Sequence, residues 1–324
     1  MVRRLLVTGA SGTLGRHVAM RAKADGWDVV GTYHSTRAAL DIQWHRLDIR
    51  DRQAVIALVR AVSPTAIVHT AFQQRGAEMW ATTAQGTAFV AQAAHGAGSR
   101  LVHLSSDAIF DGTDNPYFES AQPRPITPYG AAKAAAELTV AVTAPRAAIV
   151  RTSWTISRDP LDPHTRLILD VAAGRRPERV FSDEYRCPIG VDDLAAAVVE
   201  LAAHDYAGII NVAGPDALSR YELGRLVAKA YNLSVAELPT TTVAASGLHH
   251  GYFCPTPRNG KSSSRRQLWS SSPLAPRRKR RAESLLPALR RTVASSGQGF
   301  AQNSCRYRCH NQHADSLQRR WLLA

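Results

Sequence analysis

A tyrosine and a lysine four residues apart, Tyr129 and Lys133, are the side chains of this sequence that most directly suggest chemistry. On a helix this spacing places both side chains on one face. A tyrosine has an ordinary pKa of about 10, so it donates a proton poorly at neutral pH unless its phenolate is stabilised. Lys133 supplies a positive field for that purpose. The pair predicts a proton donor, although the spacing alone is common by chance.

A serine at the end of an apolar strand is a third candidate. The apolar run at residues 101–104 is followed by Ser105, Ser106 and Asp107. In a doubly wound sheet the ends of the strands present the ligand. At that edge the hydroxyl of Ser106 can donate a hydrogen bond to an alkoxide that develops on a substrate.

Glycines recur at three-residue spacing between an apolar run at 3–8 and a helical pattern at 14–23. The first glycine permits a tight turn, the second lets the backbone approach a pyrophosphate, and the third lets helix and strand pack closely. The start of the helix attracts the phosphate charge. A purely structural turn is the alternative. We predict a dinucleotide site that includes Gly9, Ser11, Gly12, Thr13, Leu14 and Gly15.

The segment after the next β-rich run, residues 27–32, indicates which dinucleotide is preferred. An acidic side chain there would bond the ribose 2′-hydroxyl of NAD and repel a 2′-phosphate. Residues 33–37 contain no acid, whereas Arg37, with His34 or Arg16, offers positive charge to the phosphate. The sequence therefore favours NADP over NAD. In the alternative interpretation, Arg37 only begins a solvated helix.

The elements that must position these groups follow a repeated strand and helix pattern. Alanine-rich helical stretches alternate with further apolar runs, at residues 66–69, 100–104, 147–150 and 208–212. This alternation predicts an α/β fold with a Rossmann-type doubly wound parallel sheet. Capping signals mark two helix starts, Asp192 with Asp193 before one helix and Ser219 before another.

The charge is concentrated in one part of the chain. The 324 residues carry a formal net charge of +14, of which residues 1–254 account for +1 and residues 255–324 for +13. The basic part also lacks sustained apolar periodicity. We expect residues 1–150 to form the NADP-binding Rossmann core and residues 151–254 its remaining elements and a small substrate lobe. Residues 255–324 are predicted to be a disordered basic tail.

Several classes of protein and site are disfavoured. No apolar stretch approaches the roughly 20 residues of a membrane span, and glycines interrupt the apolar run at the start too early for a secretory signal. The zinc-ligand residue types around Cys305 and Cys309 lack paired spacing, so no metal is expected. The basic run 277–281 lacks interleaved aromatics, which makes nucleic acid an unlikely partner. We expect a soluble cytoplasmic protein without a disulfide framework, from four cysteines at Cys187, Cys254, Cys305 and Cys309.

The motifs in this order resemble the extended short-chain dehydrogenase/reductases, and within them the dTDP-4-dehydrorhamnose reductase group. The resemblance covers about residues 3–250, and its most telling segment is 105–112, which reads SSDAIFDG where the group has STDYVFDG. It implies that Ser106 takes the catalytic Ser/Thr position. It also implies that Tyr129 is the proton donor and that Lys133 is its partner, which bonds the nicotinamide ribose as well.

The resemblance extends to binding residues. It implies that Asp48 meets the adenine ring, and that the neighbouring Ile49 also binds the cofactor. Thr70 and Ala71 are implied to lie beside the cofactor. Two departures from the family pattern stand out. Thr83 replaces a helix asparagine that holds a proton-relay water, and residues 183–189 read DEYRCPI where the family has DQxGxPT. The residues implied to contact the substrate are Ser106, Asp107, Trp154 and Arg186.

Two functions are compatible with this pattern. The first is an NADP-preferring reductase of a keto-sugar nucleotide such as dTDP-4-dehydrorhamnose, with Tyr129 as proton donor. The alternative is a non-catalytic NADP-binding regulatory or structural subunit, because relatives with this fold serve as partners of another enzyme. A membrane partner is not expected, and a homodimer is left open.

The basic tail leads to a prediction about the gene. A reading-frame shift in a high-GC gene produces Arg-, Ser- and Pro-rich sequence without selection for folding. We expect another reading frame near codons 248–260 to encode an apolar, periodic closing segment, which sequencing of the coding DNA would reveal. If neither frame does, the tail is a real appendage. Salt-sensitive DNA binding that is lost on truncation at Cys254 would then indicate a basic arm.

Overall fold

The structure is a computed structural model that describes residues 3–113, 116–233 and 238–246. The chain divides into residues 1–259 and 260–324, and the second part lies wholly outside the described residues. The predictions for the basic tail at 255–324, including the rejected zinc site, therefore also fall outside them.

A seven-stranded sheet carries the fold, with the strand order β11-β6-β5-β4-β1-β2-β3. Every neighbouring pair is parallel, so the carboxyl ends of all seven strands lie at one edge. The connections change direction between β1 and β4, where a doubly wound sheet binds its ligand. The predicted Rossmann-type α/β fold is confirmed. The strands are β1 (Arg4–Thr8), β2 (Asp28–Tyr33), β3 (Gln43–Arg46), β4 (Ala66–His69), β5 (Arg100–Leu104), β6 (Ala148–Arg151) and β11 (Gly208–Asn211).

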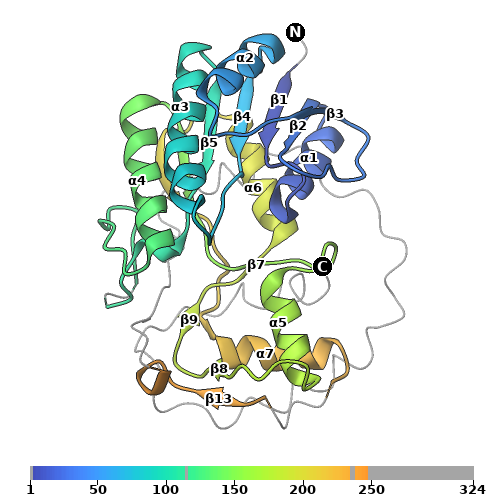
Figure 1. Cartoon of the computed structure of the whole chain (residues 1–324), viewed down its shortest axis with the longest axis vertical. Helices are drawn as coiled ribbons and strands as arrows, with labels where there is room; N and C mark the ends of the chain where they lie inside the picture. The colour runs from blue at the N-terminus through green and yellow to red at the C-terminus, as the bar shows by residue number, and fades with distance from the viewer. Residues whose placement is uncertain (1–2, 114–115, 234–237, 247–324) are drawn as a thin grey trace, which may run out of the picture. The chain divides into compact units, whose positions relative to one another are not determined.

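Helices cover both faces of the sheet (Figure 1). One face packs against α1 (Thr13–Ala24) and α6 (Val191–Ala203), and the other against α2 (Arg52–Val62), α3 (Gly86–Gly96) and α4 (Pro128–Thr143). Within β1, Leu5 and Val7 belong to the first apolar core and Leu6 to the second. Burial on both faces explains why the strands read as continuous apolar runs rather than alternating ones.

A small lobe is formed by elements that follow β6 in the chain. Its apolar centre includes Val171, Val180 and Leu238, and in Figure 1 its helices and two of its strands lie together. A short pair outside the lobe, β7 (Thr155–Ile156) with β10 (Ile189–Gly190), leads into α6. The lobe consists of α5 (Pro163–Ala172), α7 (Arg220–Ala230), and the strand pairs β8 (Val180–Phe181) with β13 (Thr240–Thr241) and β9 (Tyr185–Arg186) with β12 (Leu218–Ser219).

The two predicted helix caps have different outcomes. Ser219 caps α7 as predicted, and with Glu222 it forms a reciprocal capping box. The prediction for Asp192 and Asp193 is wrong, because α6 begins at Val191 and its cap is Gly190, without a side-chain cap. The two carboxylates lie in the first turn instead, where their negative charge interacts favourably with the helix dipole.

Three other features depart from the sequence expectations. The strand β3 was not predicted, because Gln43–Arg46 is a short, largely polar edge strand. A π-helical turn at Ala81–Gln85 precedes α3 and contains Thr83. Cys187 is disulfide-bonded, whereas the cysteine spacing suggested no such bond. No helix in the described ranges has the length and apolar character needed to cross a membrane.

A buried ion pair fixes α4 over the sheet. Arg151 of β6 and Glu137 of α4 are almost fully buried and lie 2.8 Å apart. The same guanidinium donates to the carbonyl oxygens of Glu119, at 3.2 Å, and Ala121, at 3.0 Å. Burial of a charge is costly unless it is paired and fully hydrogen-bonded, a condition that this arrangement meets. The helix that carries Tyr129 and Lys133 is thereby tied to the central sheet.

Candidate active site

The start of α4 lies directly against the turn that contains Ser106. The Thr127 side chain caps this helix by accepting a hydrogen bond from the Gly130 amide at 3.0 Å. A Cβ at Gly130 would lie 2.0 Å from the carbonyl oxygen of Ala108, so only glycine permits this approach. As a result, the Tyr129 hydroxyl lies close enough to Ser106 for the two side chains to interact. The structure thus brings together two side chains that lie 23 residues apart in the sequence.

Lys133 lies one turn further along α4 and is buried. Its Nζ donates a hydrogen bond to the carbonyl oxygen of Leu104, at the end of β5, at 2.8 Å. It also lies 5.1 Å from the centre of the Phe72 ring, which follows β4. Burial lowers the pKa of Lys133 to about 8, an effect that the carboxylate of Glu137 partly opposes. The ammonium is therefore largely protonated at neutral pH and becomes neutral in mildly alkaline solution.

The electrostatics around Tyr129 differ from the expectation. Burial and the negative charge of Asp107 raise its pKa well above the ordinary value, while the hydrogen bond with Ser106 opposes the shift. The sequence suggested the opposite direction, because Lys133 was the only charge considered. The phenol therefore stays protonated over the neutral range. Phe72 lies beside it, with the two ring centres 5.9 Å apart.

The glycine turn follows β1 at the same edge of the sheet. Gly9 has a φ of +71°, and a Cβ there would lie 2.8 Å from the Cα of Ala71, so the turn lies against the end of β4. Thr70 reinforces this contact by donating to the carbonyl oxygen of Thr8 at 2.8 Å. A Cβ at Gly15 would lie 2.2 Å from the Gly9 carbonyl oxygen. The first and third glycines are thus required by the fold.

Gly12 is not required by the fold in the same way. A Cβ there would come no closer than 3.4 Å to the Gly9 carbonyl oxygen, which is an ordinary contact. Gly12 is exposed at the start of α1, where no side chain caps the helix and the first turn contains no acid. The buried Nε of Arg16 has no hydrogen-bond partner among the described residues. An open glycine, free amides and a spare cationic donor fit the pyrophosphate of a dinucleotide.

The residues predicted to select the dinucleotide lie in the segment between β2 and β3. Arg37 is exposed, and His34 lies 3.7 Å from a carboxylate oxygen of Asp48. Asp48 is held by Arg50, at 2.6 Å, which lowers the pKa of the carboxyl to about 2. Ile49 is buried in the apolar core beneath. His34 and Asp48 thus come together, as one site would require.

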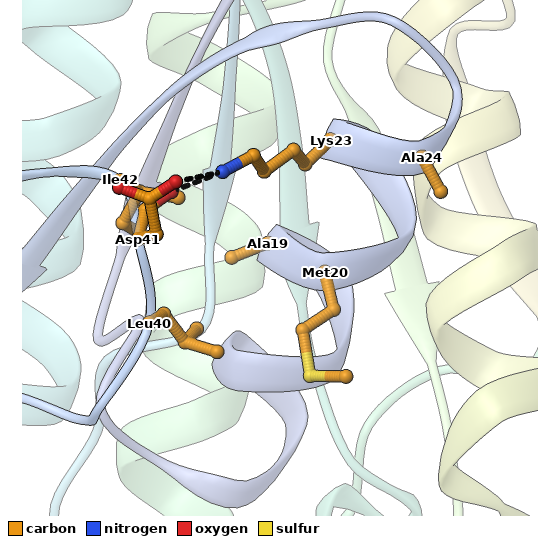
Figure 2. Close-up of a pocket in the computed structure, with 7 residues that line it drawn as sticks. All are labelled: Ala19, Met20, Lys23, Ala24, Leu40, Asp41 and Ile42. Atoms are coloured by element: carbon orange, nitrogen blue, oxygen red, sulfur yellow. Dashed lines mark hydrogen bonds and ion pairs between the residues drawn. The ribbon is translucent and has the colours of Figure 1, made fainter.

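A separate pocket lies between α1 and the end of this segment (Figure 2). Apolar side chains line most of it, and Lys23 closes one side through a hydrogen bond and ion pair of 2.7 Å to Asp41. It contains none of the predicted site residues. Its contacts hold residues 40–42 against α1, and so anchor the segment that presents Arg37. The pocket is lined by Ala19, Met20, Lys23, Ala24, Leu40, Asp41 and Ile42.

The predicted substrate residues form one buried group next to Ser106. Asp107 pairs with Arg186 at 3.0 Å and accepts a hydrogen bond from Ser153 at 2.7 Å. The Trp154 ring lies 5.6 Å from the Arg186 guanidinium and 4.2 Å from that of Arg220. The carboxylate of Asp107 is therefore engaged by the protein's own side chains, and Trp154 is packed among cations.

Sequence reasoning missed two buried histidines behind the site, His69 of β4 and His103 of β5. Their rings are stacked, with centres 5.5 Å apart, and burial together with the charge of Lys133 lowers the pKa of both. His69 is hydrogen-bonded to the hydroxyls of Thr8, at 2.6 Å, and Thr87, at 3.0 Å. Both histidines are neutral at neutral pH. In the sequence, only their position within apolar strands indicates that these histidines are buried.

The fold and the site together define a class of protein. A doubly wound parallel sheet, a glycine turn after β1, and Ser106, Tyr129 and Lys133 gathered at the carboxyl edge characterise the extended short-chain dehydrogenase/reductases, which are NAD(P)-dependent oxidoreductases. The chain belongs to the RmlD substrate binding domain family, whose pattern matches residues 3–264. This confirms the resemblance to the dTDP-4-dehydrorhamnose reductases and extends it beyond residue 250.

Two relatives illustrate the range of the family. A dTDP-4-keto-6-deoxy-D-glucose reductase of Streptomyces niveus is 32% identical over 78% of this chain and 88% of its own length. A methionine adenosyltransferase 2 subunit beta of Xenopus laevis is 29% identical over 74% of this chain and 75% of its own length. Relatives thus include both an enzyme and a protein named as a subunit.

Solved structures support the same assignment. A dTDP-4-dehydrorhamnose reductase from Bacillus anthracis in complex with NADP superposes with a TM-score of 0.67 and 25% identity, over 80% of this chain and 90% of that one. WbmH of Bordetella bronchiseptica, in complex with NAD+, has a TM-score of 0.69 over 85% of this chain and 94% of that one. At 20% identity the second structure supports the fold alone.

The open position at Gly12 leads to a prediction. We expect Gly12→Val to weaken binding of a nicotinamide dinucleotide at least tenfold, measured by calorimetry, because the added side chain occupies the space that a phosphate needs. The melting temperature should change little, since a Cβ meets only an ordinary contact there. Gly96→Ala is the matched control, because a Cβ at Gly96 meets nothing within 4 Å. Unchanged binding by Gly12→Val would remove this turn from the cofactor site.

Proposed function

We propose that this protein is an NADPH-preferring reductase of a keto-sugar nucleotide such as dTDP-4-dehydrorhamnose. The observation that carries the proposal is the contact between Ser106 and Tyr129, with Lys133 buried one helical turn away, at the edge that also holds the glycine turn. Relatives named as reductases of dTDP-linked keto sugars support the substrate class. The bound dinucleotide would supply a hydride to the carbonyl carbon of the substrate.

In this proposal the side chains handle the oxygen of the substrate. The Ser106 hydroxyl donates a hydrogen bond to the carbonyl oxygen and stabilises the negative charge that develops there. Tyr129 then gives its proton to the same oxygen. Because the pKa of Tyr129 is raised, the phenol is in the protonated form that a reduction requires. An alkoxide is a stronger base than a phenolate, so the transfer is still favourable.

Lys133 has two tasks in the proposed reaction. Its positive charge offsets the negative charge of the phenolate while the proton is on the product, and its ammonium can bond the ribose next to the nicotinamide. Burial strengthens the attraction between the Lys133 ammonium and the phenolate, because charges interact more strongly in a medium of low polarity. The pyrophosphate would be held by the glycine turn, at Gly9, Ser11, Gly12, Thr13, Leu14 and Gly15. The adenosine half of the cofactor would lie against Asp48 and Ile49, and Thr70 and Ala71 would also lie beside the cofactor.

A cofactor-binding subunit without turnover is the second candidate function. It is favoured by one specific observation, the similarity to a methionine adenosyltransferase 2 subunit beta. Tight NADPH binding, no reduction of any keto-sugar nucleotide, and co-purification with a partner enzyme would support it over the reductase.

The function is tested by the oxidation of NADPH with dTDP-4-dehydrorhamnose and related keto sugars. We expect the wild type to turn over and Tyr129→Phe to lose at least a hundredfold in kcat, because proton transfer by a positioned side chain contributes factors of this order. Tyr231→Phe is the matched control, since it removes the same hydroxyl from an exposed residue at the end of α7. Equal rates for wild type and Tyr129→Phe would exclude Tyr129 from the mechanism.

The pKa of Lys133 predicts how the rate depends on pH. A lysine is charged below its pKa, so kcat should fall as the pH rises through about 8 and the ammonium is lost. In Lys133→Arg the cation persists, so the fall should move to clearly higher pH even if the maximal rate is lower. The measurement is kcat between about pH 6 and pH 10 at saturating NADPH. The same alkaline fall in both proteins would assign it to another group.

Cofactor choice is tested at Arg37. We expect NADPH to bind more tightly than NADH, and Arg37→Ala to remove roughly tenfold of that difference, because a hydrogen bond to a charged group contributes about 1.5 to 3 kcal/mol. Arg60→Ala removes another exposed arginine, on α2, and should leave both affinities unchanged. A wild-type preference for NADH would refute the interpretation of residues 33–37.

A further inference from the structure

Four charged side chains of alternating sign connect Ser106 with the small lobe. Asp107 pairs with Arg186 at 3.0 Å, Arg186 with Glu184 at 3.1 Å, and Glu184 with Arg220 at 2.9 Å. The side chains of Asp107, Arg186 and Glu184 are less than one-tenth exposed. Two carboxylates and two guanidinium groups together carry no net charge, and each buried charge has an opposite neighbour, as burial requires. Only Asp107 belongs to the turn after β5, and the other three come from the lobe or the loop that enters it.

The carboxylate of Asp107 is shared between Arg186 and Ser106. Its Oδ1 accepts from a terminal nitrogen of Arg186 at 3.0 Å and from the hydroxyl of Ser106 at 3.3 Å. Its Oδ2 accepts from Ser153 at 2.7 Å. A charge-assisted contact is stronger than one from a neutral hydroxyl, and hydrogen bonds weaken as the distance grows. Arg186 is therefore the main partner of Oδ1, and the hydrogen of Ser106 is held only weakly.

The position of Arg186 is itself well defined. It lies on β9, whose pairing with β12 fixes the backbone, with Leu218 opposite Arg186. Its guanidinium lies over the Trp154 ring and contacts Glu184 through the terminal nitrogen that does not meet Asp107. These contacts hold the Arg186 guanidinium beside the Asp107 carboxylate, 3.0 Å away.

We propose that Arg186 is a positioning residue for the reduction, which occupies Asp107 and so keeps the hydroxyl of Ser106 available to the carbonyl oxygen of the substrate. The inference rests on the proposed function and deepens it. Without Arg186, the carboxylate would accept the Ser106 hydrogen fully and turn it away from the substrate. An uncompensated negative charge would also remain beside Tyr129 and oppose the formation of phenolate.

The first test replaces the guanidinium by a neutral group of similar size. We expect Arg186→Gln to lower kcat at least tenfold with KM for NADPH within twofold of wild type, because Arg186 acts on the substrate oxygen through Asp107 and Ser106. Arg186→Lys, which keeps the charge, should recover part of the loss. Arg175→Gln is the matched control in the small lobe, since Arg175 pairs at the surface with Asp170, and its kcat should stay within twofold of wild type.

The decisive variant is Asp107→Asn in the Arg186→Gln background. If Arg186 acts by occupying the carboxylate, removing the negative charge should make the double variant at least threefold faster than Arg186→Gln alone. If Arg186 only supports the fold, the double variant will be as slow as Arg186→Gln or slower, and the proposal is overturned. Circular dichroism and melting temperature establish that each variant is folded.

A measurement without substrate separates this inference from the proposed function. If the wild type reduces no keto-sugar nucleotide, the proposed function fails, and urea unfolding of Asp107→Asn, Arg186→Gln and the double variant decides the inference. Non-additive losses of stability show that the two side chains are coupled as proposed. Additive losses of stability would overturn the inference whether or not the wild type turns over, because Arg186 would then not hold Asp107.

Discussion

The close approach between Gly130 and the carbonyl oxygen of Ala108 is the constraint on which the site depends. A helix can lie this near to the turn after β5 only where it has no Cβ. The contact places Tyr129 against Ser106 and lets Lys133 reach the end of β5. The Arg151–Glu137 ion pair ties a later turn of the same helix to β6. With two fixed points, α4 holds its polar side chains in one geometry, and positioning of this kind accounts for much of enzyme catalysis.

The second constraint is the balance of buried charge. Lys133 is buried with no carboxylate of the described residues in direct contact, and burial lowers its pKa to about 8. The two histidines behind it avoid the cost of a further buried cation by remaining neutral. On the other side of Ser106, Asp107 and Glu184 alternate with arginines. Ser106 and Tyr129 therefore lie between a lysine whose pKa is lowered to about 8 and a network whose charges cancel.

The network also explains how a buried arginine is accommodated at residue 186. A buried guanidinium is costly where its charge is left unpaired. Here the Arg186 guanidinium fills the space between Asp107, Glu184 and the Trp154 ring. Fold alone does not separate the reductases from the subunit among the relatives.

The sequence by itself determined the alternation of strands and helices and the position of the glycine turn, and it singled out Ser106, Tyr129 and Lys133 as candidates, because these depend on local periodicity and short spacings. It did not predict β3, the π-helical turn at 81–85, or the start of α6 at Val191, where polar composition or a shift of a few residues hides the element. The tertiary structure alone decided that Arg186 meets Asp107, that Tyr129 has a raised rather than a lowered pKa, and that two histidines stack behind Lys133. These properties depend on burial and on contacts between residues far apart in the chain, which no local pattern records.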